Sequence, residues 1–178
     1  DARRQRQMCI RDSRIKSAIN KNSQVYWVCP LIDESESELI GIEDLEKILK
    51  KEFDSQDYEI IHGKMKNMDK QKILSDFKEK KTKILLATTV IEVGIDVPDA
   101  NIMVIENSER FGLAQLHQLR GRVGRGEKES FCILMHSDSL TELSEKRLEI
   151  ITETNDGFVI AEEDLKLRGP GDILGLSQ

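Results

Sequence analysis

A three-layer α/β sandwich, with a parallel sheet covered by helices on both faces, is the fold class that this sequence predicts. Short apolar runs rich in β-branched and aromatic residues recur along the chain, as is typical of buried strands. Amphipathic segments with helical spacing separate these runs, and strands that alternate with helices form parallel βαβ units. At 178 residues the chain is long enough for one such domain and a small appendage.

The elements of this fold follow in order from the apolar pattern. One amphipathic segment places five apolar residues on a single helical face: Leu39, Ile42, Leu45, Ile48 and Leu49. A later helix has Asn67 as its candidate N-cap. The predicted strands are 24–32, 58–63, 83–89, 101–107 and 130–136, and the predicted helices are 13–22, 37–53, 69–81 and 112–120.

After His136 the alternation stops, and the rest of the chain predicts a helical appendage. A long helix leads to a turn at 155–157, and a shorter helix then runs into a Gly-Pro-Gly loop. The first residues have no amphipathic period and resemble a translated sequencing adapter. We therefore expect a non-native or disordered segment at 1–11, the main lobe at 12–138, and a helical hairpin with a loop at 139–178.

Composition excludes several broad classes of protein. A formal net charge of -6 argues against a protein that coats nucleic acid through bulk charge, so any phosphate contact must be local. No apolar run approaches the roughly 20 residues that span a bilayer, and we expect no membrane partner. Cys9, Cys29 and Cys132 lack CxxC spacing, and two of them lie in apolar runs, as buried thiols do; a reducing cytoplasm fits this pattern.

Two short segments carry the candidate chemistry, and the first is 84–100. Its strand ends in Thr88 and Thr89, whose hydroxyls and nearby backbone amides suit a phosphate. Gly94 then allows a ligand to approach the backbone closely, and Asp96 offers an acceptor for a ribose hydroxyl. Taken alone, the segment is better explained as a strand capped by threonines before an aspartate turn.

The second segment, QLRGRVGRG at 118–126, places Arg122 and Arg125 one helical turn apart among glycines. A guanidinium group offers planar donors and a permanent charge, which stabilise the transition state of phosphoryl transfer. Gln118, one turn earlier, is placed to orient a water molecule or a partner loop. The alternatives are a loop that binds nucleic-acid backbone nonspecifically and an exposed basic turn.

The cradle that would hold a nucleotide is missing from the sequence. No GxxxxGK[ST] loop occurs anywhere in the chain. Asp33 and Glu34 follow a strand, where a nucleotidase would hold Mg²⁺, but the acidic run continues into the next helix and suits its amino-terminal dipole. We therefore expect Arg122 and Arg125 to act across an interface, on a nucleotide held by another domain.

Both segments resemble motifs of superfamily 2 helicases, whose motor is two RecA-like lobes that close on ATP. ATTVIEVGIDVP is similar to motif V, and QLHQLRGRVGRG is similar to motif VI. By that resemblance the chain is the second lobe, and the first lobe supplies the phosphate loop and a DExH-type box. Four stretches narrow the resemblance to the RecG family, over nearly everything after the first dozen residues: YWVCPLIDESE, HGKM, GRVGRGEKESFCILM and TNDGFVIAEEDLKLRGPGDILGLSQ.

The resemblance implies roles for particular residues. Those matching motif VI act on the ATP phosphates: Gln118, Arg122 and Arg125. Those matching motif V lie near the nucleotide, Gly94 and Asp96, or approach the DNA backbone, Thr88 and Thr89. The last stretch is similar to the translocation motif of RecG and of the translocase Mfd, in which a helical hairpin and loop couple motor closure to DNA movement. Its polar coupling positions match Arg147, Arg168 and Gln178, and the loop is expected to be truncated after the last of these.

The resemblance also implies an activity and partners. The full protein is expected to be an ATP-dependent helicase acting on replication forks and Holliday junctions, with ATP and Mg²⁺ bound mainly by the missing first lobe. Its partners would be branched double-stranded DNA and, within the same protein, the first RecA-like lobe and a wedge domain. The fragment alone is expected to be inactive. An Mfd-like translocase and a stand-alone binding module are the alternatives; RGPGD and HGKM favour RecG.

Several candidates have a plainer interpretation beside the functional one. His62 and Lys64 follow a strand and suit a DNA-backbone contact, although a histidine at a strand end is more often a structural hydrogen-bonder. His117 is explained equally by packing or capping, and Trp27 is better explained as core than as a base-stacking platform. Without the resemblance, Arg147 would be an ordinary solvated arginine paired with a neighbouring glutamate.

Overall fold

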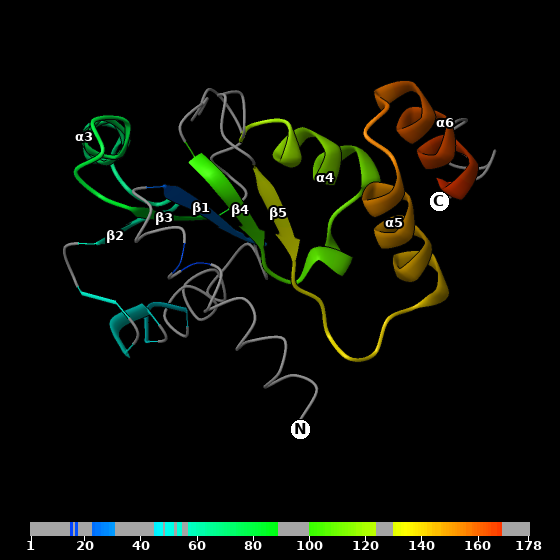
Figure 1. Ribbon diagram of the computed structural model, residues 1–178, viewed down its shortest axis with the longest axis horizontal. Helices are drawn as coiled ribbons and strands as arrows, with labels where there is room; N and C mark the ends of the chain where they lie inside the picture. The colour runs from blue at the N-terminus through cyan, green and yellow to red at the C-terminus, as the bar shows by residue number, and fades with distance from the viewer. Residues whose placement is uncertain are drawn as a thin grey trace.

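A parallel five-stranded sheet forms the centre of the molecule in the computed structural model (Figure 1). The strands are β1 (Gln24–Cys29), β2 (Tyr58–Ile61), β3 (Ile84–Thr88), β4 (Ala100–Ile105) and β5 (Phe131–Leu134), in the order β2-β3-β1-β4-β5. All four strand pairs are parallel, which confirms the predicted fold class. The structure describes residues 15, 17, 23–30, 45–47, 49–51, 53, 54, 57–88, 100–123 and 130–168.

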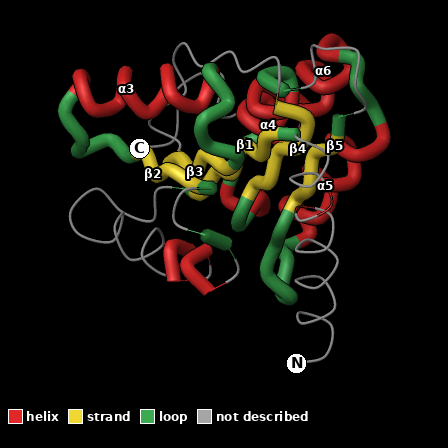
Figure 2. Tube along the Cα trace, turned by 60° about the vertical axis from the view of Figure 1, so that its left-hand side comes forward, coloured by secondary structure: helices red, strands yellow, loops and turns green. Residues whose placement is uncertain are grey.

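Helices cover both faces of this sheet. The described helices with defined bounds are α3 (Asn67–Lys78), α4 (Leu113–Arg120), α5 (Glu142–Glu153) and α6 (Gly157–Arg168), with a short 3-10 helix, η2 (Ser108–Arg110). Two views place α3 and α4 on one face, and the helical residues at 45–47 and 49–51 on the other (Figures 1 and 2). Helices α5 and α6 pack against each other and against α4, beyond the β5 edge.

Alternate residues of each strand enter two separate hydrophobic clusters. On the α3 and α4 face, Tyr26 and Val28 of β1 pack with the buried apolar residues of the helices. On the opposite face, Val25 and Trp27 pack with Ile15 and with Leu49 from the predicted helix at 37–53. Because side chains of a strand point alternately to opposite faces, a sheet buried on both sides needs apolar residues at every position. The unbroken apolar runs in the sequence reflect this requirement.

The predicted cap of α3 is wrong. The helix begins at Asn67 itself, and the preceding residue, Lys66, is the N-cap, with extended backbone (φ -64°, ψ 146°) and no side-chain cap hydrogen bond. The backbone N–H of Lys70 already donates to the carbonyl of Lys66 at 3.1 Å, so the first turn closes one residue earlier than expected. The Asn67 backbone is helical as a result, which is not the conformation of a capping residue.

The carboxyl-terminal appendage differs in detail from its prediction. Helices α5 and α6 both have 12 residues, rather than a long helix followed by a shorter one. Gly157 is the first residue of α6 rather than part of the turn, and the Asp156 carboxylate accepts a hydrogen bond from the backbone N–H of Phe158 at 2.8 Å. Leu148, Ile151 and Ile160 of this hairpin join the α4-facing core cluster. The hairpin therefore shares the hydrophobic core of the lobe.

Trp27 belongs to the core, as predicted. Its side chain is 1% exposed, and its indole N–H donates to a carboxylate oxygen of Glu106 at 3.2 Å. Cys29 and Cys132 form no disulfide. Burial raises the pKa of the Cys132 thiol to about 11, against a smaller opposite effect of Arg120, so this thiol is neutral near pH 7. No helix among the described residues is long and apolar enough to cross a membrane.

Candidate nucleotide and DNA interface

The carboxyl edge of the sheet is where ligands bind in open α/β folds. Thr88 is the last residue of β3 and pairs in register with Cys29, the last residue of the central strand β1. On the other side of β3, Ile61 of β2 pairs with Ala87, which places the following residue, His62, beside the same edge. The parallel sheet therefore brings two of the predicted DNA-contacting positions to neighbouring strand ends.

Thr88 is buried at this edge, with 2% of its surface exposed. That burial favours a role in holding the strand end over a direct hydroxyl contact to a DNA phosphate. The other predicted residues of motif V lie outside the described part of the chain: Thr89, Gly94 and Asp96.

Helix α4 carries the segment that resembles motif VI. Gln118 is exposed near its end, Gly121 is its C-cap, and Arg122 is half-buried directly afterwards. The backbone N–H of Arg122 donates to the carbonyl of Leu119 at 3.0 Å, so the turn that presents this arginine is tied to the helix. Arg125 lies outside the described residues.

Arg120, the first arginine of this segment, has a role that the sequence does not indicate. Its guanidinium group donates to the carbonyl oxygens of Ile151 at 2.6 Å and Thr154 at 2.9 Å, and it lies 3.1 Å from Nδ1 of His117. These partners are 31 and 34 residues away in the chain, or one turn back on α4. Arg120 is therefore directed at the hairpin, a tertiary contact with no local sequence signal.

The loop after β2 presents an imidazole and an ammonium group. His62 is half-buried, and its Nδ1 is buried without a hydrogen-bond partner among the described residues. Lys64 is exposed, while Lys70 donates to the carbonyl of Gly63 at 2.6 Å and so fixes the loop from α3. A buried polar atom without a partner is costly, which favours a site where an external group completes the hydrogen bond.

Lysines are concentrated in this loop and along α3. Residues 62–83 contain eight lysines against three acidic residues, an excess of five positive charges in a chain whose net charge is -6. Four of these lysines are exposed and form no ion pair with any described residue: Lys64, Lys66, Lys72 and Lys78. Such a local excess is suited to a phosphodiester backbone, and a charge count along the sequence would have found it.

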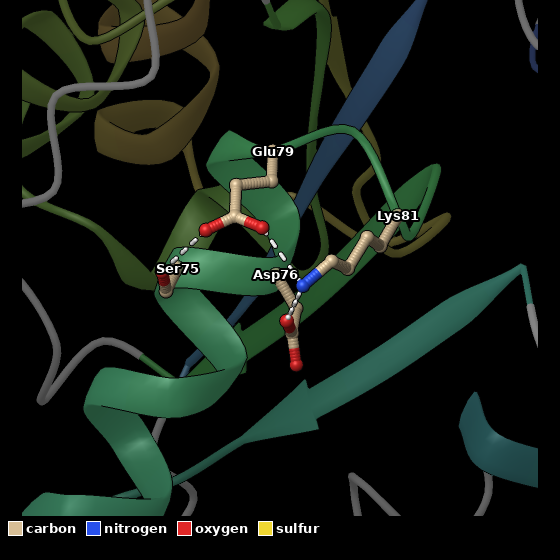
Figure 3. Close-up of polar contacts among 4 residues, drawn as sticks. All are labelled: Ser75, Asp76, Glu79 and Lys81. Atoms are coloured by element: carbon tan, nitrogen blue, oxygen red, sulfur yellow. Dashed lines mark hydrogen bonds and ion pairs between the residues drawn. The ribbon is translucent and has the colours of Figure 1, made fainter.

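Lys81, at the carboxyl end of α3, is the contrasting case (Figure 3). Its ammonium group lies 2.9 Å from Oδ1 of Asp76 and 2.7 Å from Oε2 of Glu79, while Ser75 donates to Oε1 of Glu79 at 3.2 Å. The hydrogen bonds from Lys81 and then from Ser75 lower the pKa of Glu79, and the two carboxylates raise the pKa of Lys81. The charge of Lys81 is therefore offset within the lobe, unlike those of Lys64 and Lys66.

The predicted coupling residues lie on the hairpin or beyond it. Arg147, on α5, is half-buried; its Nε is buried without a hydrogen-bond partner, and no ion pair joins it to Glu145 or Glu149. The interpretation as a solvated, glutamate-paired arginine is therefore wrong. Arg168, near the end of α6, is exposed and pairs with Asp164 at 2.8 Å. Gln178 lies outside the described residues.

Metal ligands do not gather in the described part of the chain, where no group of three or more His, Cys, Asp or Glu residues is placed to hold an ion. The phosphate-directed groups here are cations, Arg122 and the exposed lysines, which suit an anionic ligand. Asp33 and Glu34, the weaker candidates for Mg²⁺, lie outside the described residues.

Comparison with known proteins gives the same assignment over most of the chain. Residues 9–127 match the helicase conserved C-terminal domain family, and residues 154–178 match the carboxyl-terminal part of domain 3 of the ATP-dependent DNA helicase RecG. RecG of Pasteurella multocida is 52% identical over 163 residues, and RecG of Escherichia coli K12 is 48% identical. Each alignment covers 91% of this chain but 24% of the relative, so the chain spans about a quarter of the length of these curated relatives.

Solved structures extend the comparison to the fold. RecG bound to a three-way DNA junction has a TM-score of 0.77 and 44% identity, covering 96% of this chain and 22% of that one. The helicase MrfA bound to DNA and AMPPNP, at 17% identity, has a TM-score of 0.60 over 90% of this chain and 23% of that one, which shows the shared fold alone. With a RecA-like sheet and a motif VI helix in place, this chain belongs to the helicase conserved C-terminal domain family and resembles the carboxyl-terminal lobe of RecG.

Proposed function

We propose that this chain is the second motor lobe and translocation motif of a RecG-like ATP-dependent helicase that acts on replication forks and Holliday junctions. The observation that carries this proposal is the placement of Gln118 and Arg122 at the end of α4, in a chain without a GxxxxGK[ST] loop. Groups suited to a phosphate are present without the cradle that holds it. The lobe then serves a nucleotide bound elsewhere in the protein.

ATP and Mg²⁺ are bound mainly by the first RecA-like lobe in this proposal. Closure of the two lobes brings Arg122 and Arg125 to the phosphates, where permanent guanidinium charge stabilises the transition state. Gly94 and Asp96 approach the nucleotide from motif V. The relatives' shared description as ATP-dependent helicases supports the nucleotide assignment.

Branched double-stranded DNA is the proposed substrate, with a wedge domain of the same protein recognising the branch. His62, Lys64, Thr88 and Thr89 contact the DNA backbone at the carboxyl edge of the sheet, and the lysine excess on α3 extends this surface. The RecG structure with 44% identity is bound to a three-way junction, which supports this class of DNA. Reduced Cys29 and Cys132 fit the cytoplasm as the compartment.

An Mfd-like translocase is the second candidate. The match of residues 154–178 to the RecG domain favours RecG over it. A stand-alone binding module would bind DNA without hydrolysing ATP. The proposed division into 1–11, 12–138 and 139–178 is common to the two enzyme interpretations.

The experiment that tests the function compares the full-length protein with the 178-residue chain. ATP hydrolysis and strand separation are measured with a three-way DNA junction, with linear duplex and without DNA. We expect the full-length protein to hydrolyse ATP in a junction-stimulated manner and to unwind the junction, and the chain alone to do neither. ATP hydrolysis by the chain alone, or none by the full-length protein, would contradict the proposal.

Replacing Arg147 or Arg168 with alanine in the full-length protein should separate hydrolysis from movement. We expect junction-stimulated ATP hydrolysis to stay within about threefold of normal and unwinding to fall by at least about tenfold, since a loss of that size corresponds to about 1.4 kcal/mol of coupling. The Arg168 ion pair is exposed, and Arg147 Nε has no hydrogen-bond partner among the described residues, so neither substitution removes a strong stabilising contact.

Lys166→Ala is the matched control on the same hairpin, because Lys166 forms exposed ion pairs with Glu162 and Glu163 on α6. It should change neither activity. If hydrolysis and unwinding fell together in the Arg147 or Arg168 variants, the coupling role would be wrong.

A further inference from the structure

Arg120 closes the carboxyl end of α5 from a different helix. The last carbonyl groups of an α-helix lack intrahelical partners and carry partial negative charge. Helix α5 has no basic residue in its last turn and ends at an extended Thr154. The guanidinium group of Arg120 donates to Thr154 O at 2.9 Å and to Ile151 O at 2.6 Å. It therefore supplies both the donors and the positive charge that this helix end requires.

His117 continues this contact to the start of α6. Its Nδ1 lies 3.1 Å from Nη2 of Arg120; because a guanidinium nitrogen only donates, Nδ1 must be the acceptor and carry no proton. On the other side of the ring, a Cβ atom added to Gly157 would lie 3.2 Å from Nε2, closer than side chains normally pack. The imidazole thus occupies the space beside Gly157, the first residue of α6.

Three links therefore join one turn of α4 to the α5–α6 turn: two hydrogen bonds to the end of α5 and one close contact to the start of α6. Arg122 lies two residues after Arg120, on the turn that the backbone of Leu119 holds to α4. A displacement of α4 that moves Arg122 must therefore also displace the α5–α6 turn, or break these links.

We propose that Arg120 is a positioning residue that, with His117, transmits the movement of the phosphate-directed arginines to the hairpin. Resting on the proposed function, this inference names the side chain through which nucleotide-driven closure reaches the α5–α6 turn. Arg120 contacts neither nucleotide nor DNA in this role; it keeps the two helix ends in register with α4.

A surface cleft of about 350 Å³ lies beside this contact, lined in part by Arg120, Phe131, Cys132 and Asn155. When Arg120 is shortened, water from this cleft reaches the exposed carbonyls of α5. Those carbonyls are then hydrated rather than buried without partners, which limits the loss of stability. A variant at this position is therefore expected to fold, and its effect on coupling is measurable.

The test is Arg120→Gln in the full-length protein, with ATP hydrolysis and the base pairs unwound per ATP measured on a three-way junction. We expect hydrolysis to stay within about threefold and the base pairs per ATP to fall at least about fivefold, the lower range of coupling between sites. Arg120→Lys should recover part of the loss, because an ammonium group reaches the carbonyls but lacks the planar fork that also reaches His117. Gly157→Ala should lower the same ratio with Arg120 intact.

Arg110→Gln is the matched control, since Arg110 is exposed on η2 and removes the same charge. An unchanged ratio in Arg120→Gln would overturn the proposal. So would a fall in both activities in proportion to a lower thermal unfolding temperature, because that result indicates a structural role alone. If Arg120→Gln fails to fold, the ratio in Arg120→Lys and Gly157→Ala decides by the same criterion. Failure of the proposed function itself would be recognised in the unaltered protein, as the absence of junction-stimulated hydrolysis.

Discussion

Replacing Arg125 with alanine in the full-length protein is expected to lower junction-stimulated ATP hydrolysis by about 1,000-fold or more, the effect of removing an arginine from a phosphoryl-transfer site. A guanidinium group at the phosphates stabilises charge that develops in the transition state, and no water molecule replaces a fixed cation there. Without hydrolysis, unwinding should be lost as well. ATP binding should change far less, because the first lobe holds most of the nucleotide.

The measurement is steady-state hydrolysis with saturating junction DNA, beside the affinity for a fluorescent ATP analogue. Arg110→Ala is the control, because it removes the same side chain from an exposed position on η2. Unfolding temperatures of the two variants should agree with that of the unaltered protein. Near-normal turnover in Arg125→Ala would contradict the assignment of this arginine to the ATP phosphates.

Replacing Trp27 with alanine is expected to destabilise the 178-residue chain by about 3–5 kcal/mol, as large-to-small substitutions of buried aromatic residues do. The side chain is 1% exposed and packs among Ile15, Leu49 and Val104 on the face of the sheet opposite α4. Its loss leaves a cavity and removes the hydrogen-bond donor to Glu106. Both effects act on the folded state.

Urea denaturation followed by far-ultraviolet circular dichroism measures this change, because Trp27 is the one tryptophan in the sequence and cannot serve as the fluorescent probe. Phe158→Ala is the matched control: it removes a large aromatic side chain that is 90% exposed, and should change stability by less than about 0.5 kcal/mol. A stability loss below 1 kcal/mol, accompanied by weaker DNA binding, would instead favour a base-stacking role for Trp27.

The buried strands were predictable because their environment leaves a mark at every position. In β1, Val25 and Trp27 pack on one face while Tyr26 and Val28 pack on the other, so both faces demand apolar residues and the run is unbroken. The cap of α3 was not predictable in the same way. Whether Asn67 caps the helix or begins it depends on the backbone angles of Lys66, which composition alone does not set.

The candidate site divides along the same line. Gln118 and Arg122 were found from sequence because their spacing on α4 is local, and the lysine excess around α3 is also a local property. Arg120 was missed, although it stands between them. Its partners, Ile151 and Thr154, come from α5, and only the packing of α5 against α4 brings those carbonyls within reach.

The nucleotide sequence of the intact gene upstream of residue 12 tests most directly whether these arginines serve a nucleotide held by another lobe of the same protein. We expect an open reading frame that encodes an oligonucleotide-binding wedge, a GxxxxGK[ST] loop and a DExH-type box, read from source DNA by a single long read. A native start at this point would contradict that expectation. Arg122 and Arg125 would then have no nucleotide of their own chain to act on, and a stand-alone binding module would be the better interpretation.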